Sequence, residues 1–248
     1  MARVDTRNGV HVKTVQCEGV QPIGMFEASL SGFSKGVNEH DEIVCLDIVA
    51  SLYERRNWFA RGTIASLCCN VPIAVGGGIR SLDDAQNLRQ LGADRIIVNT
   101  AAIKKPHLIS EIAESMGSQA VVLQIDTRRY GDDYYCFTMG GREPSALKVS
   151  DWLRNEHVQQ AGEVMVTSIE SEGTDIEFPH DLVRLLIDKS TNPLILSGGI
   201  SSAEQIISLY ENFGITAFCF SSIINRKGKM VREVRAELDK AGLPVRRI

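Results

Sequence analysis

The sequence predicts an α/β protein, specifically a (β/α)8 TIM barrel built from two similar half-barrels. Two observations support this fold class: a repeat that divides the chain near its midpoint, and eight short apolar runs that alternate with helical patterns. The runs are rich in Val, Ile and Leu and mostly lack polar alternation, as expected of parallel strands covered on both faces. Eight βα units in 248 residues match the usual size of such a barrel.

An internal repeat relates the two halves of the chain, about 1–120 and 121–248, at a constant offset of 121 residues. Two halves of four units close a ring by pseudo-twofold symmetry, so the repeat favours a closed barrel over a doubly wound open sheet. No linker of disordered composition interrupts the chain, which predicts a single domain over 1–248. The matching segments are 4–7 with 125–128, 42–48 with 163–169, 77–79 with 198–200, and, after a one-residue insertion, 92–103 with 214–224.

The elements are expected in regular order along the chain. Amphipathic stretches lie between the apolar runs, and several open with Ser, Asp or Pro and close near Gly, which are helix start and stop signals. These helical stretches include 82–92, 106–117 and 178–189. The strands are expected near 2–5, 43–48, 72–75, 95–98, 119–125, 163–168, 193–197 and 216–221.

The composition is that of a soluble globular protein, with 44% hydrophobic and 23% charged residues. A net charge of -4 and the lack of a basic run argue against nucleic acid as the main partner. No apolar run reaches the length of a membrane span and no signal core opens the chain, so we expect a cytoplasmic protein. The six cysteines lack CxxC spacing and the five histidines lack metal-ligand spacing, so we expect reduced thiols and no bound metal.

Two aspartates in matching phrases are the candidate catalytic residues. Asp5 in VDTR ends the first expected strand, and Asp126 in IDTR ends the fifth. In a ring of eight these strands stand opposite each other, and the chemistry of such barrels gathers at the C-terminal strand ends. Each aspartate alone could simply cap its own loop. As a symmetric pair across the mouth they favour general acid and general base catalysis.

Glycine-rich turns after the third and seventh strands are candidate phosphate sites. Backbone N–H groups can approach an anion closely there, and the following helix start favours negative charge. A single glycine-rich segment could serve only to make a tight turn. Two equivalent copies predict a long ligand with a phosphate at each end. The donors are Gly77, Gly78, Asn99 and Thr100 on one side, and Gly198, Gly199, Ser221 and Ser222 on the other.

Three charged residues begin strands and are expected at the barrel floor. Glu42 and Glu163 begin the second and sixth strands, and Arg95 begins the fourth. Charges inside a protein are expensive unless they are paired. In the structural interpretation, these three residues form an ion-pair layer or are exposed outward. In the functional interpretation, they form a gate for a polar species that moves along the barrel axis.

These motifs together make the chain similar to the cyclase subunit family of imidazole glycerol phosphate synthase. The resemblance covers nearly all of 41–248. It implies that ammonia adds to a doubly phosphorylated aminoimidazole-carboxamide ribonucleotide with an opened ribulosyl chain. Lysis and ring closure then give imidazole glycerol phosphate and the carboxamide ribonucleotide. The stretches that carry the resemblance are DEIVCLDIVAS (41–51), 75–103, GSQAVVLQID (117–126), AGEVMVTSIESEGT (161–174) and LSGGI (196–200).

The resemblance also implies residue roles. Asp5 and Asp126 are the acid/base pair, and Lys13 is a loop lysine that contacts the substrate. Ammonia comes from a glutaminase, a glutamine amidotransferase subunit docked on the barrel floor as a heterodimer, and no cofactor or metal is implied. Asp47 and Ser168 line the mouth; Gly78, Asn99 and Thr100 hold one phosphate; Glu172, Gly173, Gly199 and Ser222 belong to the other phosphate site; and Glu42, Arg95 and Glu163 are gate residues.

The sequence departs from the family in three places, which support alternative functions. The chain starts within the first strand, without the usual lead-in and its gate arginine. The first loop reads QPIGMF (21–26), and Glu170 and Glu172 stand where the family has aspartates. One alternative is a related barrel that supports amidation of a sugar with ammonia for surface polysaccharides. The other is a non-catalytic activator of a glutaminase, which predicts an intact floor and a decayed mouth, the reverse of what the sequence shows.

Overall fold

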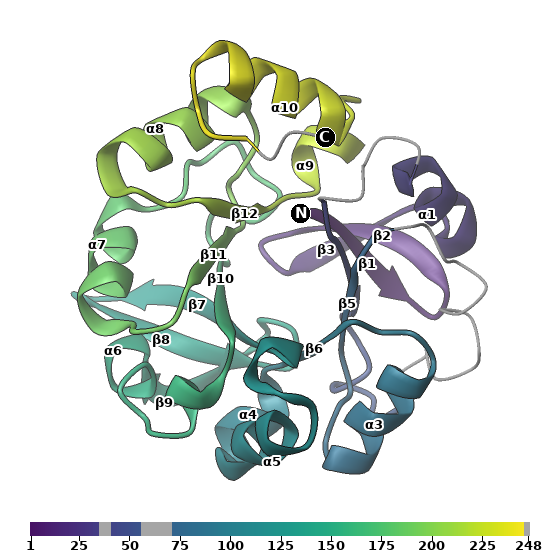
Figure 1. The fold of residues 1–248 in the computed structure, drawn as a ribbon, viewed down its shortest axis with the longest axis vertical. Coiled ribbons are helices and arrows are strands. Elements are labelled where there is room, and N and C mark those ends of the chain that lie inside the picture. The colour runs from purple at the N-terminus through teal and green to yellow at the C-terminus, as the bar shows by residue number, and fades with distance from the viewer. Residues whose placement is uncertain (35–40, 56–70, 246–248) are drawn as a thin grey trace.

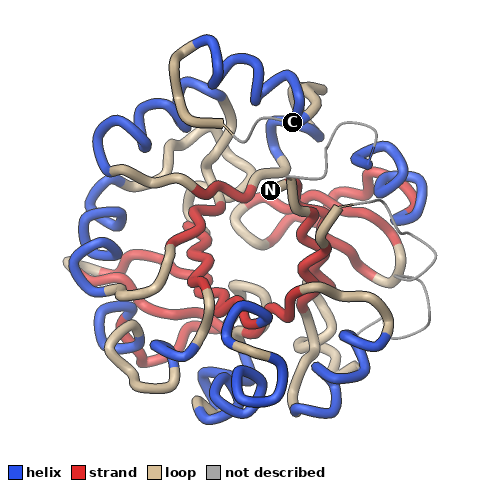
Figure 2. Tube along the Cα trace, in the orientation of Figure 1, coloured by secondary structure: helices blue, strands red, loops and turns tan. Residues whose placement is uncertain are grey.

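A ring of parallel strands forms the centre of the protein (Figures 1 and 2). The computed structural model describes residues 1–34, 41–55 and 71–245. Within these residues the parallel pairing runs through eight strands, each bonded to the next. They are β1 (Ala2–Arg7), β4 (Ile43–Asp47), β5 (Ile73–Gly76), β6 (Arg95–Val98), β7 (Val121–Tyr130), β10 (Glu163–Ser168), β11 (Leu194–Ser197) and β12 (Ala217–Cys219).

The two ends of this curled sheet are joined. A parallel bridge pairs Ala2 with Phe220, next to β12. The backbone N–H of Arg3 donates to the carbonyl of Phe220 at 3.0 Å, and the N–H of Phe220 donates to Met1 at 3.1 Å. This closure matches a (β/α)8 barrel and is absent from an open sheet. The parallel α/β architecture predicted from the sequence is therefore confirmed.

The first strand extends two residues beyond the range expected from the sequence, 2–5. β1 has 6 residues, and its register with β4 extends from Ala2 to Thr6. Ala2 and Val4 point outward into the main core, and Arg3 and Asp5 alternate with them toward the barrel interior. The strand therefore supplies both its outer packing face and its inner face to the ring.

The helices surround the ring, and the stretches 82–92, 106–117 and 178–189 are confirmed as helical. Ser81 begins α3 by accepting a hydrogen bond from the N–H of Asp84, and Ser202 begins α8 in the same way. Gly214 ends α8 in the left-handed conformation, at φ +68°. The helices are α1 (Phe26–Ser34), α3 (Leu82–Gln90), α4 (Thr100–Lys104), α5 (His107–Met116), α6 (Val149–Trp152), α7 (His180–Lys189), α8 (Ala203–Phe213), α9 (Ser222–Asn225) and α10 (Val231–Lys240), with short 3-10 turns at Ser118–Ala120 and Val158–Gln160.

Apolar packing occurs in two layers. The larger layer lies between the outward faces of the strands and the helices. A smaller cluster lies inside the ring, and its side chains come from every barrel strand except β1. This inner cluster separates the two ends of the barrel axis, so polar groups at the floor and at the mouth form distinct sites. Its buried members are Val44, Leu46, Ala74, Ile97, Val122, Met165, Ile195 and Cys219.

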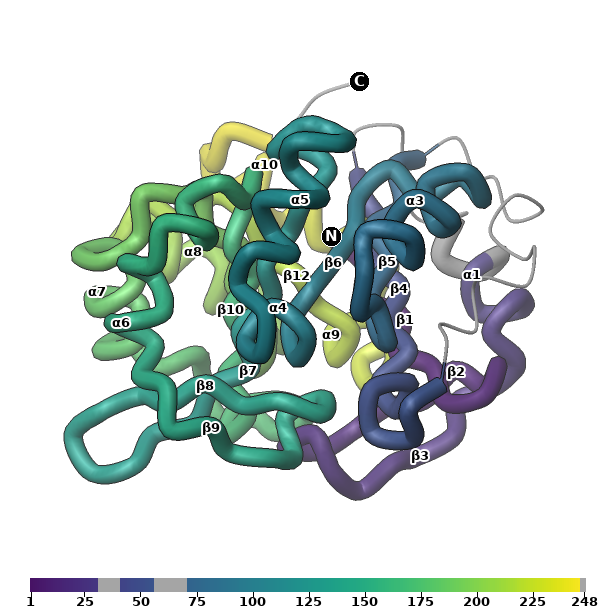
Figure 3. The backbone as a smooth tube through the Cα atoms, turned by 90° about the horizontal axis from the view of Figure 1, so that it is seen from below, coloured from purple at the N-terminus to yellow at the C-terminus, as the bar shows by residue number. Residues whose placement is uncertain are grey.

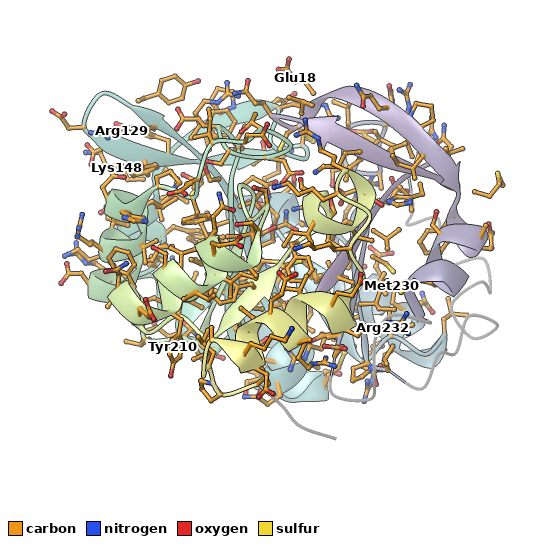
Figure 4. All side chains as sticks on the ribbon, turned by 90° about the horizontal axis from the view of Figure 1, so that it is seen from above. Glu18, Arg129, Lys148, Tyr210, Met230 and Arg232 are labelled. Atoms are coloured by element: carbon orange, nitrogen blue, oxygen red, sulfur yellow. The ribbon has the colours of Figure 1, made fainter. Side chains whose placement is uncertain are left out.

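Two antiparallel extensions rise from opposite strands at the same end of the barrel (Figure 3). β1 continues into β2 (Val10–Val15) and β3 (Glu18–Met25), and β7 continues into β8 (Asp133–Thr138) and β9 (Glu143–Lys148). Figure 4 shows Glu18 on one extension and Arg129 on the other, far from Tyr210 at the opposite end of the molecule. Lys13 was expected in a loop, but it lies on the strand β2.

Across 1–34, 41–55 and 71–245, no helix combines the length and the apolar content needed to cross a bilayer.

Candidate active site

Two buried carboxylates lie at the C-terminal ends of opposite barrel strands. Asp5 is 1% exposed and Asp126 is 2% exposed. Each lies one residue before its strand's parallel pairing ends, at the pairs Thr6 with Asp47 and Thr127 with Ser168. Three strands separate β1 from β7 in either direction around the ring. The structure thus places the two aspartates where the sequence predicts them.

The hydrogen-bond partners of the two carboxylates differ. Oδ1 of Asp5 accepts from Nε of Arg3 at 2.8 Å. Oδ1 of Asp126 accepts from Nε2 of Gln124 at 2.7 Å, and Oδ2 accepts from Nδ2 of Asn99 at 2.9 Å. Burial raises the pKa of Asp126 above its usual value, although the hydrogen bond from Gln124 and the charge of Arg3 oppose this shift. Asp126 is therefore a carboxyl that can hold a proton closer to neutral pH than an exposed aspartate.

A pocket at the mouth contains the first set of predicted phosphate donors. Gly77 has φ +99°, and a Cβ at this position would overlap the carbonyl oxygen of Asp47, so only glycine fits the turn. Gly78 also has a positive φ, +71°. The predicted residues that line this pocket are Asp47, Gly77, Gly78, Asn99, Thr100 and Asp126.

The second set of predicted donors lies beneath the β2–β3 extension. The backbone N–H of Gln16, between β2 and β3, donates to the carbonyl of Glu172 at 2.7 Å. A Cβ on Gly173 would overlap the carbonyl oxygen of Thr14 on β2. The extension therefore covers the loop after β10, and this side of the mouth is closed. The side chains of Ser168, Glu172, Ser221 and Ser222 are buried, and Gly198 and Gly199 pack against Ser168 and Ser171 of the same loop region.

Two of the predicted substrate contacts bind each other. Nζ of Lys13 on β2 donates to Oε1 of Glu172 in a buried ion pair. Burial alone would raise the pKa of Glu172, but the charges of Lys13 and Arg3 outweigh it and lower that pKa. Glu172 is therefore ionised at neutral pH and ties the β2–β3 extension to β10.

At the floor the three charged residues meet. Nη1 of Arg95 pairs with Glu163 and lies 3.5 Å from Oε2 of Glu42. Burial raises the pKa of Glu42 to about 6, and Arg95 opposes this shift while Glu163 adds to it. The structure therefore contains the ion-paired cluster predicted from the sequence, at the end of the axis opposite the aspartates. The cluster faces a groove that α8 and α10 also line.

Glu42→Gln is expected to change stability in a pH-dependent way. Because the folded pKa of Glu42 is raised, protonation favours the folded state, and this contribution is present below pH 4.5 and lost as pH rises through about 6. The free energy of unfolding of Glu42→Gln relative to wild type should therefore rise by about 2 kcal/mol between pH 4 and pH 8. Urea unfolding at pH 4 and pH 8 measures the free energy of unfolding of both proteins. The same difference between Glu42→Gln and wild type at the two pH values would contradict the prediction.

Two site residues were missed by the sequence analysis. Arg3 and Gln124 both line the pocket and contact the aspartates, yet each sits in what reads as a strand core. Their positions in the sequence could have indicated this role. Each lies two residues before an aspartate, and side chains two residues apart on a strand point to the same face. Across the described residues, no group of three or more His, Cys, Asp or Glu side chains is arranged to hold a metal ion.

A closed parallel barrel with buried polar groups at the C-terminal ends of its strands defines the class of (β/α)8 barrel enzymes, whose active sites lie at that end. A family model described as "Histidine biosynthesis protein" matches residues 4–228. The chain belongs to this histidine biosynthesis protein family, so the family predicted from the sequence is confirmed.

Curated relatives support the same family over most of their length. The subunit HisF of imidazole glycerol phosphate synthase from Legionella pneumophila is 40% identical over 83% of this chain and 96% of the relative. The HisF of Chloroherpeton thalassium is 36% identical over 98% of this chain and 96% of its own length. The HisF of Pyrococcus furiosus is 34% identical over 99% of this chain and 97% of its own length.

Proposed function

We propose that this chain is the cyclase subunit of imidazole glycerol phosphate synthase, an enzyme of histidine biosynthesis. It uses ammonia to convert the bisphosphorylated ribulosyl aminoimidazole-carboxamide ribonucleotide into imidazole glycerol phosphate and aminoimidazole-carboxamide ribonucleotide. The observation that carries the proposal is the pair of buried aspartates, Asp5 and Asp126, on opposite sides of the mouth. Addition of ammonia requires a base, and departure of the carboxamide amine requires an acid.

The substrate's two phosphates are proposed to bind on the two sides of this pair. Gly77, Gly78, Asn99 and Thr100 would hold the phosphate in the open pocket, with Asp47 beside it. The loops of Glu172–Gly173, Gly198–Gly199 and Ser221–Ser222, with Ser168, would hold the other. Because Glu172 and Gly173 are covered by β2 and the turn after it, binding at this loop would require the β2–β3 extension and Lys13 to move.

The division into two half-barrels within one domain, 1–248, is part of the proposal. Its support is equivalent packing at the offset of 121 residues. Gly77 packs against the carbonyl of Asp47, and Gly198 packs in the same way against the carbonyl of Ser168. The antiparallel extensions also follow β1 and β7, which are the equivalent strands of the two halves.

Ammonia is proposed to come from a glutaminase subunit that docks on the barrel floor as a heterodimer. Glu42, Arg95 and Glu163 would be the gate through which ammonia enters the barrel. The support is their ion-paired cluster at the floor, which borders a groove. No cofactor or metal enters the proposed reaction.

Direct turnover tests the proposal. The purified protein, supplied with ammonium salt and the bisphosphorylated carboxamide substrate, is expected to consume it and form both products, which mass spectrometry identifies. A reaction without ammonium salt is the control and should form neither product. If the protein leaves the substrate unchanged under conditions where it is folded, the cyclase assignment is wrong, and amidation of a sugar becomes the leading alternative.

A further inference from the structure

Two side chains occupy equivalent positions directly below the two aspartates. Arg3 precedes Asp5 by two residues on β1, and Gln124 precedes Asp126 by two residues on β7. Side chains two apart on a strand share a face, so both point into the barrel beneath their aspartate. Both are buried, and each donates to Oδ1 of its own aspartate, at 2.8 Å from Arg3 and 2.7 Å from Gln124. The repeat therefore places one hydrogen-bond donor under each carboxylate.

The chemistry of the two donors is different. A guanidinium carries a permanent charge and can only donate hydrogen bonds, whereas a primary amide can donate or, after rotation, accept. Arg3 is 4% exposed, and its Nη1 also donates to Oγ of Ser197 at 3.1 Å, so the cation is held in place. Arg3 thus sets a fixed positive charge against Asp5. Gln124 and Asn99, which both donate to Asp126, are uncharged.

Other charged and ionisable groups surround Asp5 and Asp126. Arg3 interacts electrostatically with Asp5, Asp126 and Glu172, so one buried cation faces several acidic groups. Lys13 is committed to Glu172. The other ionisable groups around the pair are His11 and Lys13 on β2, Cys17 before β3, Asp47 at the end of β4, Cys136 on β8, Glu172 after β10 and Cys219 on β12.

We propose that Arg3 and Gln124 are positioning residues that make the two symmetric aspartates inequivalent. Arg3 holds a permanent positive charge against Asp5, which suits Asp5 to the role of the base in the reaction. Gln124 orients Asp126 without a charge, which leaves Asp126 able to hold a proton and release it. The catalytic meaning of this asymmetry rests on the proposed cyclase function, whereas the asymmetry itself belongs to the unliganded protein.

Arg3→Gln tests the proposal, because it places the same side chain under both aspartates. The variant is expected to lower kcat with ammonium at pH 7 by at least about tenfold, and to move the acidic limb of the kcat/KM profile to higher pH by at least about one unit. Arg3→Lys keeps the charge and should restore the position of that limb. Gln124→Met removes an uncharged donor of similar size, so it should lower kcat and leave the acidic limb in place.

The proposal is overturned if the acidic limb of Arg3→Gln coincides with that of wild type, or if Arg3→Lys shifts it as far as Arg3→Gln. Should Arg3→Gln not fold, Gln124→Arg serves instead. A cation below Asp126 is expected to reduce turnover at least tenfold, and unchanged turnover would reject the proposed asymmetry.

A second readout separates this proposal from the cyclase assignment. Carboxyl ¹³C signals of aspartate, assigned with Asp5→Asn and Asp126→Asn, are recorded in the protein without substrate. Arg3→Gln should shift the Asp5 signal more than the Asp126 signal, and Gln124→Met should shift the Asp126 signal more than the Asp5 signal. If wild type has no cyclase activity but these signals shift as stated, the cyclase function fails while the inequivalence of the aspartates stands. An unmoved Asp5 signal rejects the inequivalence itself.

Discussion

Asp5→Asn and Asp126→Asn are each expected to lower ammonium-driven kcat by about 10²- to 10⁴-fold, the usual contribution of a general acid or base. Asparagine keeps the shape of the side chain and one oxygen that accepts from Arg3 or Gln124. It cannot gain or lose a proton near neutral pH. The fold should therefore survive while proton transfer is lost.

Steady-state kinetics with saturating ammonium salt measure this effect without depending on a glutaminase. Asp181→Asn is the matched control, because Asp181 is a half-exposed aspartate on α7 that pairs with Arg129. Its kcat should stay within about twofold of wild type, since surface ion pairs contribute little. Normal turnover in both Asp5→Asn and Asp126→Asn would exclude the acid/base assignment, even if the chain remains a cyclase.

Lys13→Met is expected to lower the free energy of unfolding at pH 7 by about 3–5 kcal/mol, because it leaves the buried Glu172 carboxylate without its main partner. The folded pKa of Glu172 is lowered, so its stabilising contribution is present above its ordinary value of 4.5 and is lost as pH falls through the folded pKa. The deficit of Lys13→Met should accordingly be largest at neutral pH and shrink on acidification.

Urea unfolding at pH 7 and pH 4 tests this prediction with two comparisons. Arg129→Met breaks the half-exposed pair with Asp181, near the outer end of β7 (Figure 4), and should cost no more than about 1 kcal/mol. The double variant Lys13→Met/Glu172→Met replaces both charges by apolar groups and should recover most of the lost stability. A loss in Lys13→Met no larger than that in Arg129→Met would show that the buried pair does not hold the β2–β3 extension to β10.

Much of the fold follows from local sequence patterns. The expected strand near 163–168 is observed as β10, Glu163–Ser168, and that near 95–98 as β6, Arg95–Val98. Buried parallel strands are continuous apolar runs, and helix caps are single polar residues next to them, so both can be recognised from neighbours in the chain. The constant offset then places the aspartates on opposite strands without knowledge of any contact.

The elements that were not predicted from the sequence depend on pairing with other strands. β3 (Glu18–Met25) is mostly exposed and contains Gly19, Pro22 and Gly24, which are poor strand formers. It becomes a strand because β2 offers it hydrogen-bonding partners. The last two residues of β1, Thr6 and Arg7, were also not predicted as strand, because their pairing with β4 and β2 is not visible within the first residues.

The sequence by itself determined the fold class, the family and the opposite placement of Asp5 and Asp126, since periodicity and repetition are properties of the chain alone. Only the tertiary structure decided which polar side chains meet. Lys13 reaches Glu172 across 159 residues of sequence, and Arg3 reaches Ser197 across 194. Such contacts form because closure of the ring brings distant strands together, and no local sequence pattern shows which side chains will then meet. Arg3 and Gln124, by contrast, contact their aspartates within a single strand, and they make two phrases that look alike in sequence chemically different sites.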